Sequence, residues 1–253
     1  MKSGIIIGTY AAVPQVHLQL ESWRRFCPGV RLIVSDDASP KRDQLASLCR
    51  DYDAEFRSNE TRSGHVVGDM QVFLDGIQWA TDMGLDMLVK FSRRWIPLTP
   101  WIHTAHVLFS ESGAPTLSAR CIYHRFGFRS EAIAMHVPMW IETDAVHPIR
   151  EHIEQAKRGN YVLVEAVIHQ AAQRAFEARP ARCREFETRC PHKPGCGGYI
   201  AWPWMKESRV HPRSDVLWHE WARAHEYHRA ALQWGIECYS IHDFVDTAAN
   251  ICH

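Results

Sequence analysis

The sequence lacks several features that would assign it to a large class of proteins. It has no apolar run near the roughly 18 residues that a membrane-spanning helix needs, no internal repeat and no low-complexity tract. It also has no net charge, because 29 basic and 29 acidic side chains balance. Broad electrostatic binding to nucleic acid or acidic membrane is therefore not favoured. Residues 1–8 have the pattern of a first strand rather than of a signal peptide, and we expect a cytoplasmic protein.

The first half of the chain alternates between apolar strands and amphipathic helices. The continuous apolar run at 5–7 is typical of a buried parallel strand, and mostly apolar segments predict further strands at 30–34, 54–56 and 87–91. Apolar residues at helical spacing separate these runs and predict helices over 14–26, 41–52 and 64–84. This order predicts an α/β fold with a mixed, mainly parallel sheet flanked by helices.

The second half has a weaker pattern. We expect helices at 101–109, 148–157, 162–178 and 214–234, and strands at 116–123, 128–137 and 236–239. Residues 179–203 are rich in Pro, Gly, Cys and Arg and have little periodicity, which predicts a long irregular loop.

Polar residues follow three of the predicted strands. They are Thr9 and Tyr10, then Asp36 and Asp37, then Ser92-Arg93-Arg94. The carboxyl ends of parallel strands share one edge of a sheet, where ligands bind, so we expect one crevice to collect all three groups. A simpler interpretation of the segment that begins at Asp36 is a turn followed by a helix cap.

These elements, in their order and spacing, resemble a glycosyltransferase of the GT-A fold, of the large inverting family 2 type. The residues that carry the resemblance are Ile5 to Tyr10, Leu32 to Ser39 and Leu88 to Arg94. The resemblance covers roughly residues 4–100. It implies a GT-A-like sheet, a nucleotide-sugar donor and transfer with inversion.

Particular residues take roles from this resemblance. Thr9 and Tyr10 would line the pocket for the nucleotide base. Asp36 would accept a hydrogen bond from the base or the ribose, and Asp37 would shape the turn of the same nucleotide-binding segment.

The sequence departs from the family where an Asp-x-Asp would hold a divalent metal, because it has Ser92-Arg93-Arg94 there. Negative charge grows on the leaving diphosphate, and guanidinium groups can neutralise it with fixed, permanently charged donors. We therefore expect Arg93 and Arg94 to stabilise the diphosphate, with no Mg²⁺ or Mn²⁺ at the donor site. The alternative is a solvated basic turn on a fold that has lost catalysis. Lys90 points away from Phe91 on an alternating strand and is a weaker candidate.

Inverting transfer also needs a general base for the acceptor hydroxyl. In the family it stands at the start of a helix in the second half, and Glu165 occupies that place here. His169 follows one helical turn later on the same face. An amphipathic helix that exposes both side chains explains the pattern equally well. The reserve candidates for the base are Asp144, Glu142 and His136.

A separate group of metal-ligand residues lies in the irregular segment. Cys183, Cys190, His192 and Cys196 form a C-x6-C-x-H-x3-C set. Three thiolates and one imidazole can hold zinc in tetrahedral geometry, and a metal would give this segment something to fold around. The spacing matches no common zinc module, so reduced thiols in a loop are the alternative.

The sequence thus predicts a glycosyltransferase with a nucleotide sugar as donor, a UDP-sugar being the first choice. Residues 1–100 would bind the nucleotide sugar and residues 101–253 the acceptor, within one continuous domain. The acceptor could be a glycan, a lipid, a protein or a nucleic-acid base, and the oligomeric state is open. The alternative is a non-catalytic nucleotide-binding relative that serves as a binding or scaffold module. A nucleotidyltransferase is disfavoured because residues 8–14 are poor in glycine.

Overall fold

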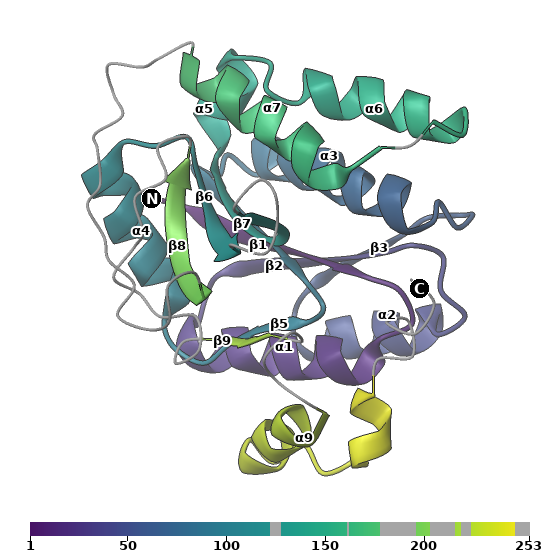
Figure 1. Ribbon diagram of the computed structural model, residues 1–253. Helices are drawn as coiled ribbons and strands as arrows, with labels where there is room; N and C mark the ends of the chain where they lie inside the picture. Colours follow the sequence, from purple (N-terminus) through teal and green to yellow (C-terminus); the bar gives the residue numbers. More distant parts are fainter. Residues whose placement is uncertain (122–127, 161, 178–195, 203–215, 219–223, 246–253) are drawn as a thin grey trace.

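A seven-stranded sheet forms the centre of the molecule. The computed structural model describes residues 1–121, 128–160, 162–177, 196–202, 216–218 and 224–245. The strand order is β3-β2-β1-β4-β7-β6-β8 (Figure 1). The strands are β1 (Ser3–Thr9), β2 (Arg31–Asp36), β3 (Glu55–Ser58), β4 (Met87–Ser92), β6 (Thr116–Cys121), β7 (Phe128–His136) and β8 (Cys196–Trp202).

Most strands of the sheet run in one direction. β1 pairs in parallel with β2 and β4, and β2 with β3. β7 runs antiparallel to both β4 and β6, so β6 shares the direction of the first four strands, and β8 is antiparallel to β6. The predicted α/β fold with a mixed, mainly parallel sheet is confirmed.

Helices cover both faces of this sheet (Figure 1). One face carries α1 (Val13–Phe26), α2 (Arg42–Asp51) and α4 (Trp101–Ser112). The other carries α3 (His65–Asp82), α5 (Val137–Glu142), α6 (His147–Lys157) and α7 (Val164–Glu177). Side chains alternate between the two faces along β1. Ile5 and Ile7 pack in the core on the α1 face, and Ile6 packs in the core on the α3 face.

The strand order places a topological switch point between β1 and β4. The chain leaves β1 through α1 on one face, and it reaches β4 through α3 on the other face. The connections therefore diverge at this point. In open α/β sheets the crevice at the carboxyl ends of two such strands is where ligands bind.

The prediction for the second half was wrong in three places. Cys196–Trp202 lies in the predicted loop but forms β8, and Val216–Trp218 lies in a predicted helix but forms β9, which pairs with β5 (Trp95–Pro97). Residues 236–239 form no strand; Ile236 instead packs in a small core beside α1. Short strands of this kind depend on their partners more than on local propensity.

The C-terminal part of the described chain packs against the outer side of α1 (Figure 1). It consists of α9 (Ala224–Gln233) and the 3-10 helix η2 (Ile241–Phe244). Its core joins Leu18 and Ile96 to Tyr227 and Phe244. In the part of the chain that the structure describes, no helix is both long and apolar enough to cross a membrane.

His17 links α1 to this C-terminal part through a chain of hydrogen bonds. Its Nε2 lies 3.0 Å from the Tyr52 hydroxyl, and its Nδ1 lies 3.1 Å from the Tyr239 hydroxyl. Tyr52 in turn donates to Glu21 at 3.1 Å. The Tyr52 oxygen therefore accepts from Nε2–H. In a neutral His17 the unprotonated Nδ1 accepts from Tyr239, so the neutral imidazole satisfies every contact of this chain.

The pKa values along this chain follow from burial and charge. Burial lowers the pKa of His17 and outweighs the nearby carboxylate of Glu21. Burial acts to raise the pKa of Glu21, but hydrogen bonds from Arg24, Tyr52 and Arg25 outweigh it and keep that pKa below its usual value. The carboxylate of Glu21 thus favours its charged form beside Arg24 and Arg25. The imidazole of His17 favours its neutral form.

We expect the contribution of His17 to stability to fall as the pH drops from 7.5 to 5.0. Its folded-state pKa lies below its unfolded-state value, so the unfolded chain takes up the proton first and unfolding is favoured in that window. The gap in unfolding free energy between the wild type and His17→Gln should shrink by about 0.5 kcal/mol, after allowance for solvent screening of a half-buried group. Urea unfolding at both pH values measures it. A gap that does not change with pH would contradict the neutral assignment.

Candidate functional site

Three predicted strand ends meet at one edge of the sheet. Thr9 pairs with Asp36 across β1 and β2, and Gly8 pairs with Ser92 across β1 and β4. β7 is antiparallel, so its first residues, including Ser130 and Glu131, lie at the same edge. Neighbouring strands are about 4.8 Å apart, so the row from β2 to β7 spans about 14 Å.

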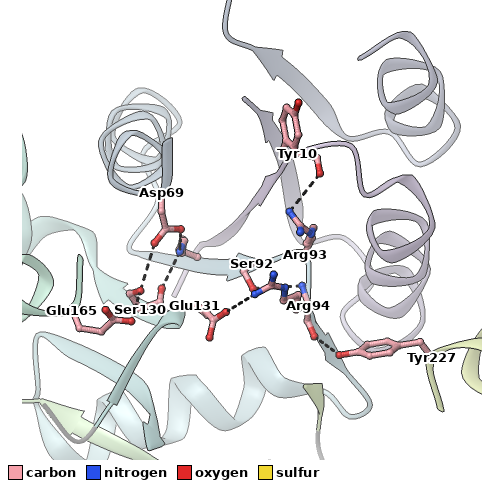
Figure 2. A network of polar contacts seen from close by, with 10 residues as sticks. Tyr10, Asp69, Ser92, Arg93, Arg94, Ser130, Glu131, Glu165 and Tyr227 are labelled. Carbon is pink, nitrogen blue, oxygen red and sulfur yellow. Dashed lines mark hydrogen bonds and ion pairs between the residues drawn. The ribbon is translucent and has the colours of Figure 1, made fainter. Parts of the chain in front are cut away.

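The turn between β4 and β5, here called the arginine turn (residues 92–95), borders the switch-point crevice. The main-chain N–H of Arg93 donates to the Gly8 carbonyl at 3.2 Å and so extends the pairing of β1 with β4. Its Nη1 donates to the Tyr10 carbonyl at 3.4 Å (Figure 2). The guanidinium of Arg93 therefore lies at the switch point, in contact with the loop that follows β1.

Arg94 turns toward the opposite side of the crevice. Its Nη1 lies 3.6 Å from Oε1 of Glu131 on β7 (Figure 2). The two side chains are 20% and 18% exposed, so this ion pair is partly shielded from water. Both predicted arginines thus contact other residues of the strand-end edge.

Two buried polar atoms lie beside the arginine turn, on β1 and β2. Asp36 is 1% exposed, and its Oδ2 accepts from Ser39 N at 2.8 Å and from Ser58 Oγ at 3.1 Å. Among the described residues, its Oδ1 and the Thr9 hydroxyl have no hydrogen-bond partner. A buried polar atom without a partner costs about 1–3 kcal/mol, so a water or a ligand group is expected there.

Asp37 holds the loop before α3. Its Oδ1 accepts from Asn59 Nδ2 and Ser63 N, each at 2.8 Å, and its Oδ2 accepts from Gly64 N at 3.0 Å. In the same loop, Arg62 stacks over the ring of Tyr10, with its guanidinium carbon 4.0 Å from the ring centroid. Asp37 is therefore placed to position a third cation at the crevice. Sequence reasoning could not find Arg62, because it stands in a polar loop without a motif.

The loops that follow β1 and β2 each contain an alanine with left-handed backbone. Ala11 has φ 55° and Ala38 has φ 54°. This region is uncommon for residues with a Cβ and stores strain of order 1 kcal/mol. Ala38 stands where the resembled motif has glycine. Among the described residues, Asp53 and Asp144 also have left-handed backbone, but aspartate tolerates it better than alanine does. The two alanines after β1 and β2 are therefore the less usual cases.

On the other side of the arginine turn lies a polar cluster formed by Asp69, Lys90, Ser130 and Glu165. Lys90 is fully buried, and its Nζ donates to Asp69 Oδ1 at 2.5 Å and to the Ser130 carbonyl at 2.9 Å. Ser130 Oγ lies 3.2 Å from Glu165 Oε1 and 3.5 Å from Asp69 Oδ2 (Figure 2). The cluster thus connects β4, α3, β7 and the first turn of α7.

The cluster brings the predicted base to the same edge as the arginines. Glu165 is 9% exposed, and Ser130, which contacts it, precedes Glu131, the partner of Arg94. Lys90 points away from Phe91 as predicted: Phe91 packs among the tryptophans of the α1 face, while Lys90 lies 4.8 Å from the ring centroid of Phe73 on α3. Lysine is rarely buried unless it is paired. The position of Lys90 within an apolar strand was therefore a sign of a buried partner, and the argument from strand alternation did not use it.

The reserve candidates for the base lie elsewhere. His136 pairs with Met87 at the start of β4, the opposite edge of the sheet. Asp144 is 49% exposed on the turn between α5 and α6, where it contacts Arg150 and Arg174. Glu142 is exposed at the end of α5. His169, one turn after Glu165, has a pKa lowered by burial.

The residues at the strand ends do not suit a divalent cation in the place where the resembled family holds one. Arg93 and Arg94 carry positive charge and have no acceptor atoms for a metal. Among the described residues, no group of three or more His, Cys, Asp or Glu side chains could hold a metal ion. The predicted zinc set is a separate matter: Cys183, Cys190 and His192 lie outside the described residues, and only the backbone of Cys196 is described.

Comparison with known proteins shows similar solved structures at low identity. No protein-family model matches the sequence, and no curated protein matches it. TarS from S. aureus in complex with UDP is 13% identical, with a TM-score of 0.48 over 70% of this chain and 55% of that one. The mannosyltransferase PcManGT from Pyrobaculum calidifontis, in complex with GDP-Man and Mn²⁺, is 15% identical, with a TM-score of 0.42 over 56% and 46% of the two chains.

A third similar structure has a different activity. It is a cytidylyltransferase from Leptospira borgpetersenii, 12% identical, with a TM-score of 0.48 over 99% of this chain and 95% of that one. The chain spans about half the length of the TarS and PcManGT chains. At these identities and TM-scores, the similarities assign neither an activity nor a substrate.

Lys90→Met should destabilise the fold. Methionine keeps the apolar stem but leaves the Asp69 carboxylate and the Ser130 carbonyl without their shared donor, so the unfolding free energy should fall by about 3 kcal/mol. Lys157→Met, which removes an exposed pair with Glu154, should change it by less than about 0.5 kcal/mol. Urea denaturation compares the two. Equal effects would show that the buried cation is not needed.

Proposed function

We propose that this protein is a glycosyltransferase that moves a sugar from a nucleotide-sugar donor to an acceptor hydroxyl, with a UDP-sugar as the first choice of donor. The observation that carries the proposal is the position of Arg93 at the switch point, where its guanidinium contacts the loop after β1. Because residues 4–100 resemble GT-A glycosyltransferases, we take this edge of the sheet as the site of the nucleotide-sugar donor.

The nucleoside would lie at the β1 and β2 side of the crevice. Tyr10 offers an aromatic face, and Arg62 covers one side of it. Asp36 has one carboxylate oxygen without a protein partner among the described residues, which suits an N–H of the base or a ribose hydroxyl. The Thr9 hydroxyl is beside it and could donate or accept.

The diphosphate would lie over the arginine turn. Arg93 and Arg94 provide permanently charged donors that can bind two phosphate oxygens at once. Their positive charge opposes a bound Mg²⁺ or Mn²⁺ at the same place, so we propose that the donor site works without one. Stabilisation of charge by fixed donors at the leaving group is worth several kcal/mol in comparable sites.

The sugar transfer would follow a single displacement with inversion. The acceptor oxygen attacks the anomeric carbon on the face opposite the diphosphate, the bond from that carbon to the phosphate oxygen breaks, and its electron pair leaves with the diphosphate. The proton of the acceptor hydroxyl passes to a carboxylate. Glu165 is our candidate, because it stands in the first turn of α7 and its Oε1 lies 3.2 Å from Ser130 Oγ at the strand-end edge.

Arg93→Ala and Arg94→Ala should each lower kcat/KM for the nucleotide sugar by more than tenfold, since each removes a fixed donor to the leaving diphosphate. Release of nucleoside diphosphate from a panel of nucleotide sugars, in the presence of EDTA, measures this. Arg57→Ala is the matched control, because Arg57 forms an exposed pair with Glu55 on β3. Wild-type activity in Arg93→Ala, or loss of activity on adding EDTA, would count against the arginine role.

Glu165→Gln should reduce kcat by about a hundredfold or more while changing donor affinity less than twofold, because the amide cannot take the acceptor proton. Transfer assays and calorimetric titration with UDP measure the two quantities. Glu177→Gln, at the exposed end of the same helix, is the control. An unchanged kcat would place the base on another residue. Nucleotide binding without turnover by the wild type would instead favour a binding module.

A further inference from the structure

The main-chain carbonyls around the arginine turn are held by side chains from distant parts of the chain. On α1, Gln19 Nε2 donates to the Ser92 carbonyl at 3.0 Å and also to the Trp95 carbonyl. Ser22 Oγ, one turn later on α1, donates to the Pro97 carbonyl. These contacts fix both ends of the turn from one side.

Tyr227 fixes the middle of the turn from α9. Its hydroxyl donates to the Arg94 carbonyl at 2.7 Å (Figure 2), although 133 positions separate the two residues. Tyr227 is 4% exposed, and its ring stacks on Phe244 with an interplanar angle of 9°. The ring is therefore held by packing, and the direction of its hydroxyl is set before any ligand arrives.

We propose that Tyr227 is a positioning residue for the diphosphate site, acting through the peptide of Arg94. This inference rests on the proposed function, because it assumes that the arginine turn binds a diphosphate. The Arg94 carbonyl belongs to the peptide that follows this residue, so holding the carbonyl restricts the backbone angle ψ of Arg94. The restricted backbone in turn limits the directions in which the Arg94 side chain can extend. Fixed donors bind an anion more tightly than donors that must first be ordered.

The position of α9 is itself secured on α1. Arg25 Nη2 donates to the Trp234 carbonyl at 2.9 Å, and Tyr239 contacts His17 at 3.1 Å. The Tyr227 hydroxyl thus contacts the arginine turn, whereas the Tyr239 hydroxyl contacts His17 of α1. Tyr239 provides a matched control for Tyr227: the same residue type, in the same part of the chain, also hydrogen-bonded through its hydroxyl, but away from the turn.

The test compares Tyr227→Phe with Tyr239→Phe in the full-length protein. Hydrogen–deuterium exchange of the peptide that covers 92–97 reports the order of the turn. Calorimetric titration with inorganic pyrophosphate in EDTA reports the anion site, and titration with uridine reports the nucleoside side. We expect Tyr227→Phe to speed exchange in 92–97 and to weaken pyrophosphate about fivefold, the effect of one net hydrogen bond. Uridine affinity should stay within twofold, and Tyr239→Phe should match the wild type in the turn and for both ligands.

The outcomes separate this inference from the proposed function. If the wild type binds pyrophosphate and Tyr227→Phe binds it equally well, the positioning role is overturned while the donor site stands. If Tyr227→Phe weakens uridine and pyrophosphate alike, the residue acts on general stability and the positioning role is again overturned. If the wild type does not bind pyrophosphate at all, the proposed function itself fails and the inference fails with it.

Discussion

The junction of β1 with β4 is the constraint on which the rest of the structure depends. The register pairs Gly8 with Ser92, and the Arg93 N–H adds one more bond to the Gly8 carbonyl at 3.2 Å. Since the strand order reverses here, the connections leave the junction on opposite faces of the sheet. The residue that directly follows β4 therefore lies at the switch point, and in this chain that residue is Arg93.

Positive charge is used in two different ways on either side of this junction. Beneath the edge, the Lys90 ammonium donates to a carboxylate and a carbonyl and faces an aromatic ring, so its charge serves the fold. At the edge, Arg93 contacts a neutral carbonyl and Arg94 a carboxylate 3.6 Å away. The row of strand ends therefore has the Thr9 hydroxyl and the Asp36 carboxylate at β1 and β2, where we propose that the nucleoside binds, a cationic centre at β4, and carboxylates at β7 and α7.

The C-terminal part of the described chain adds to this frame rather than forming a unit apart. β9 pairs with β5 directly after the arginine turn, and α9 contacts the turn through Tyr227. The predicted division into residues 1–100 and 101–253 stays a proposal about roles. In the fold itself, β6, β7 and β8 extend the same sheet that β1 to β4 begin.

Sequence reasoning succeeded where the signal was local. The segments that became β1, β2 and β4 are mostly apolar, and each ends in polar residues, so the sheet and its carboxyl edge could be predicted from them. It failed for Cys196–Trp202 and Val216–Trp218, whose strand state depends on pairing with β6 and β5. Arg62 and Glu131 could not be found either, because their contacts with Tyr10 and Arg94 depend on loop geometry and strand register.

A crystal structure of the protein with UDP, grown in the presence of EDTA, tests the central claim most directly. Our account predicts that the diphosphate lies within hydrogen-bond distance of the guanidinium groups of Arg93 or Arg94, with the base beside Tyr10 and Asp36. A diphosphate bound away from the arginine turn, or UDP that binds only when a divalent metal is restored, would contradict it.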